Sequence, residues 1–225
     1  MTRTTMGWLS LLVVLAMVGS GTAVALSLPE GTQLPLHWNQ HGAPDRMGSK
    51  WEALLTPSGV TAVMALIFFF LPSLEPRTKD LERSQGLYLM SWLGLLIVMA
   101  TAQLAMIGAA LDWGLPMLPM IQGAIGLLFF LIGNHLGKSR RMFLVGIRTP
   151  WTLSSEEVWI RTHRLAGKLL VAGGLLLMVT ALLRIPANAR PLLLIGVPIV
   201  ALLFPALWSF VLWRRERPDP GQRAG

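Results

Sequence analysis

The chain has 225 residues, of which 53% are hydrophobic and only 13% are charged, and its formal net charge is +8. Soluble domains carry roughly 25% charged residues, so this composition excludes an ordinary soluble protein. The chain contains no cysteine, which excludes disulfides, thiolate metal sites and cysteine nucleophiles.

Six apolar stretches follow one another along the chain, and none contains Asp, Glu, Lys or Arg. Each is close to the ~20 residues needed to cross a ~30 Å hydrocarbon layer, although the fifth is short unless preceding residues join it. Backbone amides in lipid must be paired within the segment, which predicts helices. We therefore predict an all-α, polytopic membrane helical bundle with six transmembrane helices, at Gly7–Leu28, Ala53–Leu74, Leu87–Leu111, Leu115–Leu136, Leu169–Leu183 and Leu192–Trp213.

The basic residues predict the orientation of this bundle. All but four of the 19 Lys and Arg residues lie at the N-terminus, in the second loop (residues 75–86), in the fourth loop (residues 137–168), or in the C-terminal tail. The positive-inside rule then predicts that both termini of this multi-pass protein are cytoplasmic. We expect the lipid bilayer as a partner, and no direct contact with nucleic acid, because we find no basic face with base-reading or stacking groups.

The first stretch has a second interpretation as a cleaved signal peptide. Arg3 precedes the apolar run, and small residues stand at Ala23 and Ala25. The run continues to Leu28, which favours a retained helix. In either case we expect the following loop, residues 29–52, to face the outside.

The external loop contains three residues that suit a metal, namely His37, His41 and Asp45, spaced by four. Prolines and glycines within the loop exclude the helix that would place these side chains on one face, and they predict turns instead. We therefore expect neither a metal nor a cofactor here.

The same loop has a central aromatic residue, Trp38, which we expect to cover the mouth of the bundle, while Asn39 ties a turn. A ligand-facing role for His37, Trp38, Asn39 and Asp45 is the alternative, because an extracellular agent meets this loop first.

Polar groups and prolines are few inside the predicted spans. Gln103 and Gln122 predict interhelical hydrogen bonds worth roughly 0.6 kcal/mol each. Pro198 and Pro205 predict a kink in the last helix. Most of the nine Trp residues stand near predicted span ends, which indicates headgroup depth.

The cytoplasmic loop, residues 137–168, contains a helix start. Ser154 can accept the N–H of Glu157, and Glu157 can reach back to the N–H of Ser154, which is a capping box. We predict a helix from Ser155 that first follows the interface and then crosses the membrane as the fifth span. On it, Glu157 and Arg161 are four residues apart and form an ion pair worth a few tenths of a kcal/mol.

Two interpretations of this loop stay open. In one it is only a capped helix that skims the lipid surface. In the other it is a docking surface, in which a polar network lies under the bundle, formed by Arg148, Glu156, Glu157, Trp159, Arg161 and His163. A catalytic site lacks a nucleophile and a cofactor signature, so we predict that the protein is not an enzyme.

Two parts of the sequence carry a resemblance to a known family. Residues 133–138 (GNHLGK), 146–159 (GIRTPWTLSSEEVW) and 162–164 (THR) resemble the SdpI family of bacterial membrane immunity proteins, which act against a secreted toxin that delays sporulation of neighbours. Residues 34–39 (LPLHWN), with Gly42, Pro44 and Asp45, resemble a short domain of unknown function often found at the N-terminus of that family.

The resemblance implies a multi-pass protein of the bacterial cytoplasmic (inner) membrane. It further implies an immunity or sensor protein that confers resistance to a secreted antimicrobial peptide toxin and, in some members, signals to a cytoplasmic transcription regulator. A small-molecule transporter or a membrane protein of unassigned role is the alternative, although the spans lack the ionisable groups that ion-coupled transporters place at mid-membrane. The candidate functional surface is Asn134, Arg148, Thr149, Pro150, Trp151, Ser154, Glu156, Glu157, Trp159, His163 and Arg164, with His37, Trp38, Asn39 and Asp45 in the external loop.

We divide the chain into two units on the same basis. Residues 1–74 form an N-terminal two-helix unit with the external loop 29–52, and residues 75–225 form an SdpI-like four-helix unit with the cytoplasmic loop 137–168.

Overall fold

The structure is a computed structural model that describes residues 2–39, 43–75, 82–142, 145–183, 185–186 and 188–216. Its elements in chain order are α1 (Arg3–Ser27), β1 (Gln33–Trp38), β2 (Pro44–Ser49), α2 (Lys50–Leu74), α4 (Gln85–Ala110), α5 (Met117–Leu136), α6 (Pro150–Ser154), α7 (Glu156–Leu182), α8 (Ala189–Pro198), a π-helical segment (Ile199–Leu203) and α9 (Phe204–Glu216). Six helices are long and apolar enough to cross a membrane, with α8 to α9 counted as one. The predicted all-α bundle of six transmembrane helices is confirmed.

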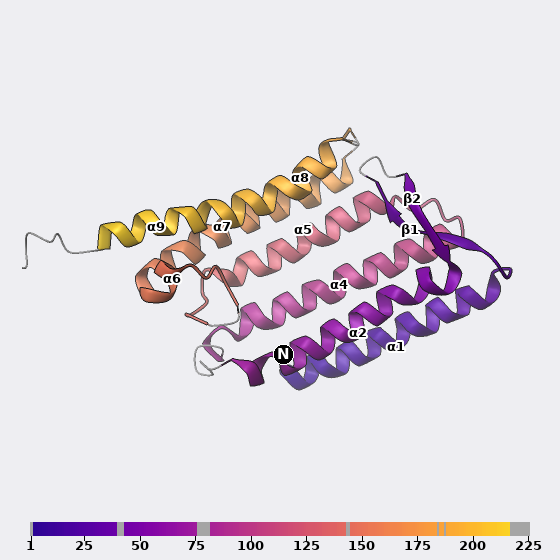
Figure 1. Cartoon of the computed structure of the whole chain (residues 1–225), viewed down its shortest axis with the longest axis horizontal. Coiled ribbons are helices and arrows are strands. Elements are labelled where there is room, and N and C mark those ends of the chain that lie inside the picture. The colour runs from indigo at the N-terminus through magenta and orange to yellow at the C-terminus, as the bar shows by residue number, and fades with distance from the viewer. Residues whose placement is uncertain are drawn as a thin grey trace, which may run out of the picture.

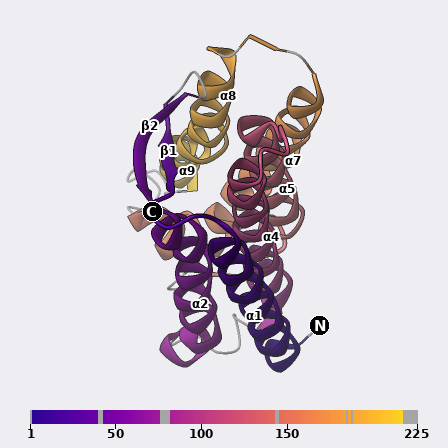
Figure 2. The ribbon, with the colours of Figure 1, turned by 90° about the vertical axis from the view of Figure 1, so that its right-hand side faces the viewer.

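The long helices lie side by side, and the short elements gather at the two ends of the bundle (Figure 1). Contacts join α1 to α2, both of these to α4, α4 to α5, α5 to α7 and α7 to α9. The β1–β2 hairpin lies at one end, which we call the hairpin end, and α6 lies at the opposite end, which we call the α6 end. The described chain starts with α1 at the α6 end and finishes with α9 at the same end (Figure 1). Viewed from the hairpin end, α8 lies far from α1 (Figure 2).

The closest helix pair is α5 with α7, and glycines make this approach possible. A Cβ built on Gly133 would lie 2.7 Å from the carbonyl oxygen of Gly167, and one built on Gly126 would lie 2.8 Å from that of Gly174. Small residues at such positions let two helix backbones come together in lipid, where no hydrophobic force drives association. The α5–α7 pair therefore forms the rigid centre of the C-terminal half.

Two glutamines join the helices inside the bundle, as the sequence predicts. Gln103 on α4 donates through Nε2 to the carbonyl oxygens of Met17 (3.3 Å) and Leu54 (3.0 Å), so it bridges α1 and α2. Gln122 on α5 donates to the Leu177 carbonyl oxygen (3.0 Å) and to Thr180 Oγ1 (2.7 Å), both on α7. Each amide satisfies its N–H groups across helices rather than in lipid.

The last span is interrupted where the sequence predicts a kink. A π-helical segment, Ile199–Leu203, separates α8 from α9, with Pro198 directly before it and Pro205 just inside α9. A proline cannot donate to the carbonyl four residues earlier, so the α-helical ladder cannot continue unchanged. The predicted interruption therefore occurs as a π-helical turn.

The fifth span is long enough to cross a membrane because its helix begins within the loop that we predict to be cytoplasmic. α7 runs without a break from Glu156 to Leu182, which confirms that the loop helix continues as the span. The predicted cap is wrong by one residue. Ser155, not Ser154, is the N-cap and accepts the N–H of Val158, while Ser154 ends the preceding helix α6. Glu157 pairs forward with Arg161 (2.6 Å), as predicted, instead of reaching back.

Two tryptophans depart from the expected position at headgroup depth. Trp92 is 1% exposed and stacks against Phe68 of α2, with ring centroids 5.8 Å apart. Trp159 is fully buried at the α6 end. Both rings fill space between helices, so their indoles are packing groups and not interfacial anchors.

Candidate functional site

Within the loop that we predict to be cytoplasmic (residues 137–168), local hydrogen bonds order residues 147–155. Thr149 caps α6, and it exchanges hydrogen bonds with Thr152 through both backbone and side-chain atoms, which forms a capping box. Pro150 occupies the first helical position, where a missing N–H costs nothing. Thr152 also donates through Oγ1 to the Ile147 carbonyl oxygen (2.9 Å), so the approach to α6 is fixed as well.

A buried histidine connects this segment to α7. His163 donates through Nδ1 to the Trp159 carbonyl oxygen (2.8 Å), because a carbonyl can only accept. Its Nε2 therefore accepts the backbone N–H of Ile147 (2.9 Å), and the imidazole is neutral in this arrangement. The ring stacks on Trp159 at 3.9 Å between centroids. His163 thus holds the loop backbone against α7.

The residue before this contact is Gly146, and its backbone geometry requires a glycine. Its φ is +116°, and an added Cβ would lie 2.6 Å from His163 Nε2 and 2.8 Å from the Trp159 ring. The positive φ and the two rings explain this glycine in the motif, because other residues would meet both backbone strain and a steric clash.

Further contacts connect the start of the loop to the same centre. Trp159 donates through Nε1 to the Ser139 carbonyl oxygen (3.2 Å), and Arg141 donates to the Leu153 carbonyl oxygen (3.1 Å). Arg140 and Glu156 form an ion pair, with 3.7 Å between Nη1 and Oε1. The described parts of the loop, residues 137–142 and 145–155, are therefore joined to each other and to α7.

The segment also contacts the last helix. Trp151 donates through Nε1 to Ser209 Oγ, and its ring packs on Phe210 with centroids 5.1 Å apart. Ser155 donates through Oγ to Glu216 Oε2 (2.7 Å) near the end of α9. A movement of α7 or α9 would consequently reach this segment.

The predicted surface residues divide into two groups by exposure. The scaffold consists of buried or half-buried side chains: Thr149, Trp151, Trp159 and His163, together with Thr152, which the sequence analysis missed. The exposed group consists of Asn134, Arg148, Pro150, Ser154, Glu156, Glu157 and Arg164. Only the exposed group can meet a partner, and the scaffold determines where its members stand.

At the hairpin end lies the loop that we predict to be external (residues 29–52). The sequence predicts turns there, and the structure adds a pair of antiparallel strands. β1 pairs with β2 in a register that includes Leu34 opposite Gly48 and Trp38 opposite Pro44. Asn39 ties the turn as predicted, because its Oδ1 accepts the N–H of Ala43 (3.1 Å). The half-buried Trp38 packs on the cluster at the hairpin ends of α1, α2 and α4, which agrees with its predicted covering role.

The metal ligands considered in the sequence come together only in part. His37 Nδ1 lies 2.6 Å from Asp45 Oδ1, and both side chains are exposed. His41 lies outside the described residues. Among the described residues, no three His, Cys, Asp or Glu side chains gather as a metal site would require.

A lysine that the sequence analysis passed over anchors the hairpin. Lys50 is 3% exposed, and its Nζ donates to the Leu28 carbonyl oxygen (2.7 Å) and to Glu30 Oε1 (3.0 Å). These bonds connect the end of α1 to the start of α2 beneath the hairpin. A buried ammonium needs such partners, since its desolvation would otherwise be costly.

A second unpredicted cation lies at the same end. Arg190 of α8 is 8% exposed and donates to Gln122 Oε1 (3.0 Å) and to the Leu183 carbonyl oxygen (3.2 Å). Arg190 precedes the predicted sixth span by two residues, and its long side chain reaches back into the bundle.

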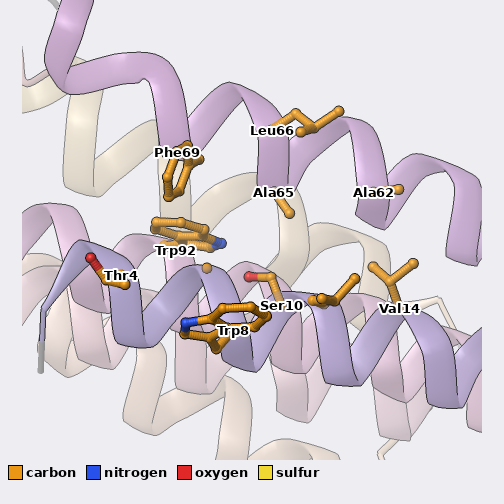
Figure 3. A pocket seen from close by; sticks show the side chains of 11 residues that line it. Thr4, Trp8, Ser10, Val14, Ala62, Ala65, Leu66, Phe69 and Trp92 are labelled. Atoms are coloured by element: carbon orange, nitrogen blue, oxygen red, sulfur yellow. The ribbon is translucent and has the colours of Figure 1, made fainter.

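An apolar cavity of about 430 Å³ opens between α1 and α2 toward the α6 end (Figure 3). Trp92 of α4 lies between the two helices, with Phe69 on the α2 side and Ser10 on the α1 side. The indole Nε1 of Trp92 is buried and has no acceptor. The sequence could have indicated that Trp92 is buried, because it lies five residues inside a predicted span and not at its end.

Comparisons with known proteins match two parts of the chain to protein families. Residues 138–209 match the SdpI/YfhL protein family, and residues 12–62 match a domain of unknown function, DUF1648. The first match covers the loop, α6, α7, α8 and the first six residues of α9, and the second covers most of α1, the hairpin and half of α2. The chain is also 25% identical over 188 residues to the "Immunity protein SdpI" of Bacillus subtilis (strain 168), covering 84% of this chain and 86% of that protein. No solved structure matches the chain.

The resemblance to the SdpI family is therefore confirmed, and so is that of the N-terminal part to the domain of unknown function. With its six apolar helices, the chain is a multi-pass cell-membrane protein.

Proposed function

We propose that this chain is an immunity protein that protects its host cell against a secreted antimicrobial peptide toxin. The observation that carries the proposal is the similarity to the immunity protein of Bacillus subtilis, which extends over 84% of this chain and 86% of that protein. The two family matches add support, because residues 12–62 include the hairpin and residues 138–209 include the α6 segment.

The proposed receiver of the toxin is the hairpin end, which we assign to the outside. Only a few basic residues lie at this end, and Lys50 and Arg190 are buried in hydrogen bonds there. Most of the basic residues lie toward the α6 end, which supports cytoplasmic termini by the positive-inside rule. His37, Trp38, Asn39 and Asp45 form the first surface that an extracellular peptide meets.

The proposed output is the exposed charged surface at the α6 end, in particular Arg148, Glu156, Glu157 and Arg164. The buried His163–Ile147 bond and the Ser155–Glu216 bond support this role, because they couple the surface to α7 and α9. A cytoplasmic transcription regulator is the partner that we propose for it, since exposed charges on a fixed scaffold suit a reversible protein contact.

Survival under toxin tests the proposal directly. Expression of the chain in a sensitive host is expected to give protection, and Trp38→Ala is expected to reduce it about tenfold, because the hairpin loses its contact with the bundle. Trp113→Ala is the matched control, since Trp113 lies in the link after α4 and its side chain is 54% exposed. Protein abundance in the membrane is measured for each variant.

The outcomes are distinct. Absence of protection against every toxin of this class would refute the immunity function. Equal losses in Trp38→Ala and Trp113→Ala would refute the special role of the hairpin. Arg148→Ala is expected to keep protection and to lose toxin-dependent changes in transcription. A toxin response of transcription in that variant as large as in the unmodified chain would refute the proposed output surface.

A further inference from the structure

A second groove, of about 530 Å³, runs between α5 and α7 at the α6 end. Its polar half is lined by Asn134 and Lys138 from the end of α5 and by Arg164 and Lys168 from α7. Its apolar half continues along α7 past Val171, Ala172 and Leu175. None of the described residues that line it is acidic.

The three cations of this groove are exposed, and in the described part of the chain no hydrogen bond or ion pair holds their side chains. Other basic residues nearby, in contrast, have partners for their side chains. Arg140 faces Glu156, Arg161 faces Glu157, and Arg141 donates to a carbonyl oxygen. Arg164 and Lys168 are four residues apart on one helix face, a spacing at which like charges repel. Lys138 adds a third positive charge across the groove.

The backbones at the floor of the groove are held close by glycine. A Cβ on Gly167 would lie 2.7 Å from the Gly133 carbonyl oxygen and 3.2 Å from the backbone nitrogen of Gly137. The two helices therefore approach closely enough for Lys138 to line the same groove as Arg164 and Lys168. The cations stay together because of the packing that brings α5 to α7, although their charges oppose it.

The depth of the groove matches a lipid boundary. α7 has 27 residues, which is about 40 Å at 1.5 Å per residue, against a hydrocarbon layer of about 30 Å. Lys168 is the last charged residue of α7, and uncharged residues alone follow to Leu182. The roughly 10 Å in excess of that layer correspond to about the first seven residues of α7, so Arg164 lies close to the boundary. The long side chain of Lys168, about one turn further in, can reach back to the headgroups, and Val171, Ala172 and Leu175 lie where acyl chains begin.

We propose that this groove is a binding site for an anionic phospholipid. Its phosphate lies among Lys138, Arg164 and Lys168, Asn134 hydrogen-bonds the headgroup, and one acyl chain follows the apolar half of the groove. Basic pockets between transmembrane helices have the chemistry that such headgroups require. The apolar half favours a lipid over a free phosphate, because a small anion would leave it unfilled. The inference shares Arg164 with the proposed output surface, but its test needs neither a toxin nor a regulator.

Lipid retention by the intact protein tests the site. The full chain is purified in detergent and mixed with phosphatidylglycerol, phosphatidylcholine or inorganic phosphate, and bound species are measured by native mass spectrometry. Retention of phosphatidylglycerol is expected to exceed that of phosphatidylcholine by on the order of a hundredfold. Each cation contributes roughly fivefold, and the triple variant K138Q/R164Q/K168Q is expected to remove the preference.

The control variant is R83Q/R214Q/R215Q, which removes the same number of positive charges from outside the groove and is expected to keep the preference. A second variant, Ala172→Trp, fills the apolar half while it leaves all three cations, and it is expected to lower phosphatidylglycerol retention severalfold. Equal loss in the charge variant and its control, retention by Ala172→Trp at the level of the unmodified chain, or equal binding of inorganic phosphate would each overturn the proposal.

Discussion

Replacement of Gly133 or Gly167 by alanine is expected to destabilise the bundle by about 1–3 kcal/mol each, the range found for overpacked cores. The added Cβ of either residue would stand 2.7 Å from the backbone carbonyl oxygen of the other, a separation that real Cβ atoms do not show. Only movement of a whole helix can relieve such a contact, because the opposing atom belongs to the backbone. The α5–α7 pair is the most extensive in the fold, so the loss reaches the entire C-terminal half.

The measurement is the midpoint of thermal unfolding, Tm, in one detergent. A penalty of this size corresponds to a fall of several degrees for a chain of about this length. Gly19→Ala and Gly59→Ala are matched controls, since both glycines are helical and have open space where a Cβ would be. They are expected to leave Tm unchanged or to raise it, because alanine favours a helix over glycine by about 1 kcal/mol. An unchanged Tm in Gly133→Ala would show that the helices are not in backbone contact.

Gly146→Ala is expected to release the loop from α7. The substitution meets two obstacles, namely a φ of +116° that L-residues rarely adopt and a Cβ 2.6 Å from His163 Nε2. Backbone strain of this kind costs about 1–3 kcal/mol, and the displaced loop also loses the hydrogen bond from Ile147 to His163 (2.9 Å). Limited proteolysis of residues 145–149 is expected to become at least tenfold faster, since a loss of about 1.4 kcal/mol in local stability gives that factor.

Gly114→Ala separates strain from contact. Gly114 has a φ of +65° but nothing near its missing Cβ, so its substitution imposes backbone strain alone. It is expected to leave proteolysis of residues 145–149 unchanged. Faster proteolysis of that segment in Gly114→Ala, or none in Gly146→Ala, would contradict the role assigned to the His163 contact.

The spans and the local pairs were predictable because their causes are local in sequence. Hydropathy alone locates six helices, and a spacing of four residues predicts the Glu157–Arg161 pair. The turn made by Asn39 depends on neighbours within four residues. Each of these features follows from residue type and spacing, without knowledge of the tertiary fold.

The helix cap was misplaced for a physical reason. Ser154 and Ser155 are adjacent and both can accept a backbone N–H, so local sequence gives no preference. The choice falls on Ser155 because α6 already includes Ser154, and because Thr149 and Thr152 fix the start of α6. The capping pair upstream therefore determines the cap downstream.

Features made by distant residues could not be predicted in the same way. Lys138 meets Arg164 and Lys168 only because glycines bring α5 onto α7. Arg190 reaches Gln122 across 68 positions of sequence. The hairpin was missed because Pro35 lies inside β1, where proline argues against a central strand although it is tolerated in edge strands.

The proposed roles of the two ends require that the hairpin end faces the outside and the α6 end faces the cytoplasm. Cysteine labelling can measure this orientation directly, because the chain contains no cysteine of its own. Single substitutions Met47→Cys in the hairpin and Ser154→Cys in α6 place one thiol at an exposed position of each end. In intact cells, a membrane-impermeant maleimide is expected to label Met47→Cys, and to label Ser154→Cys only after permeabilisation. Labelling of both in intact cells, or of Ser154→Cys alone, would contradict the account.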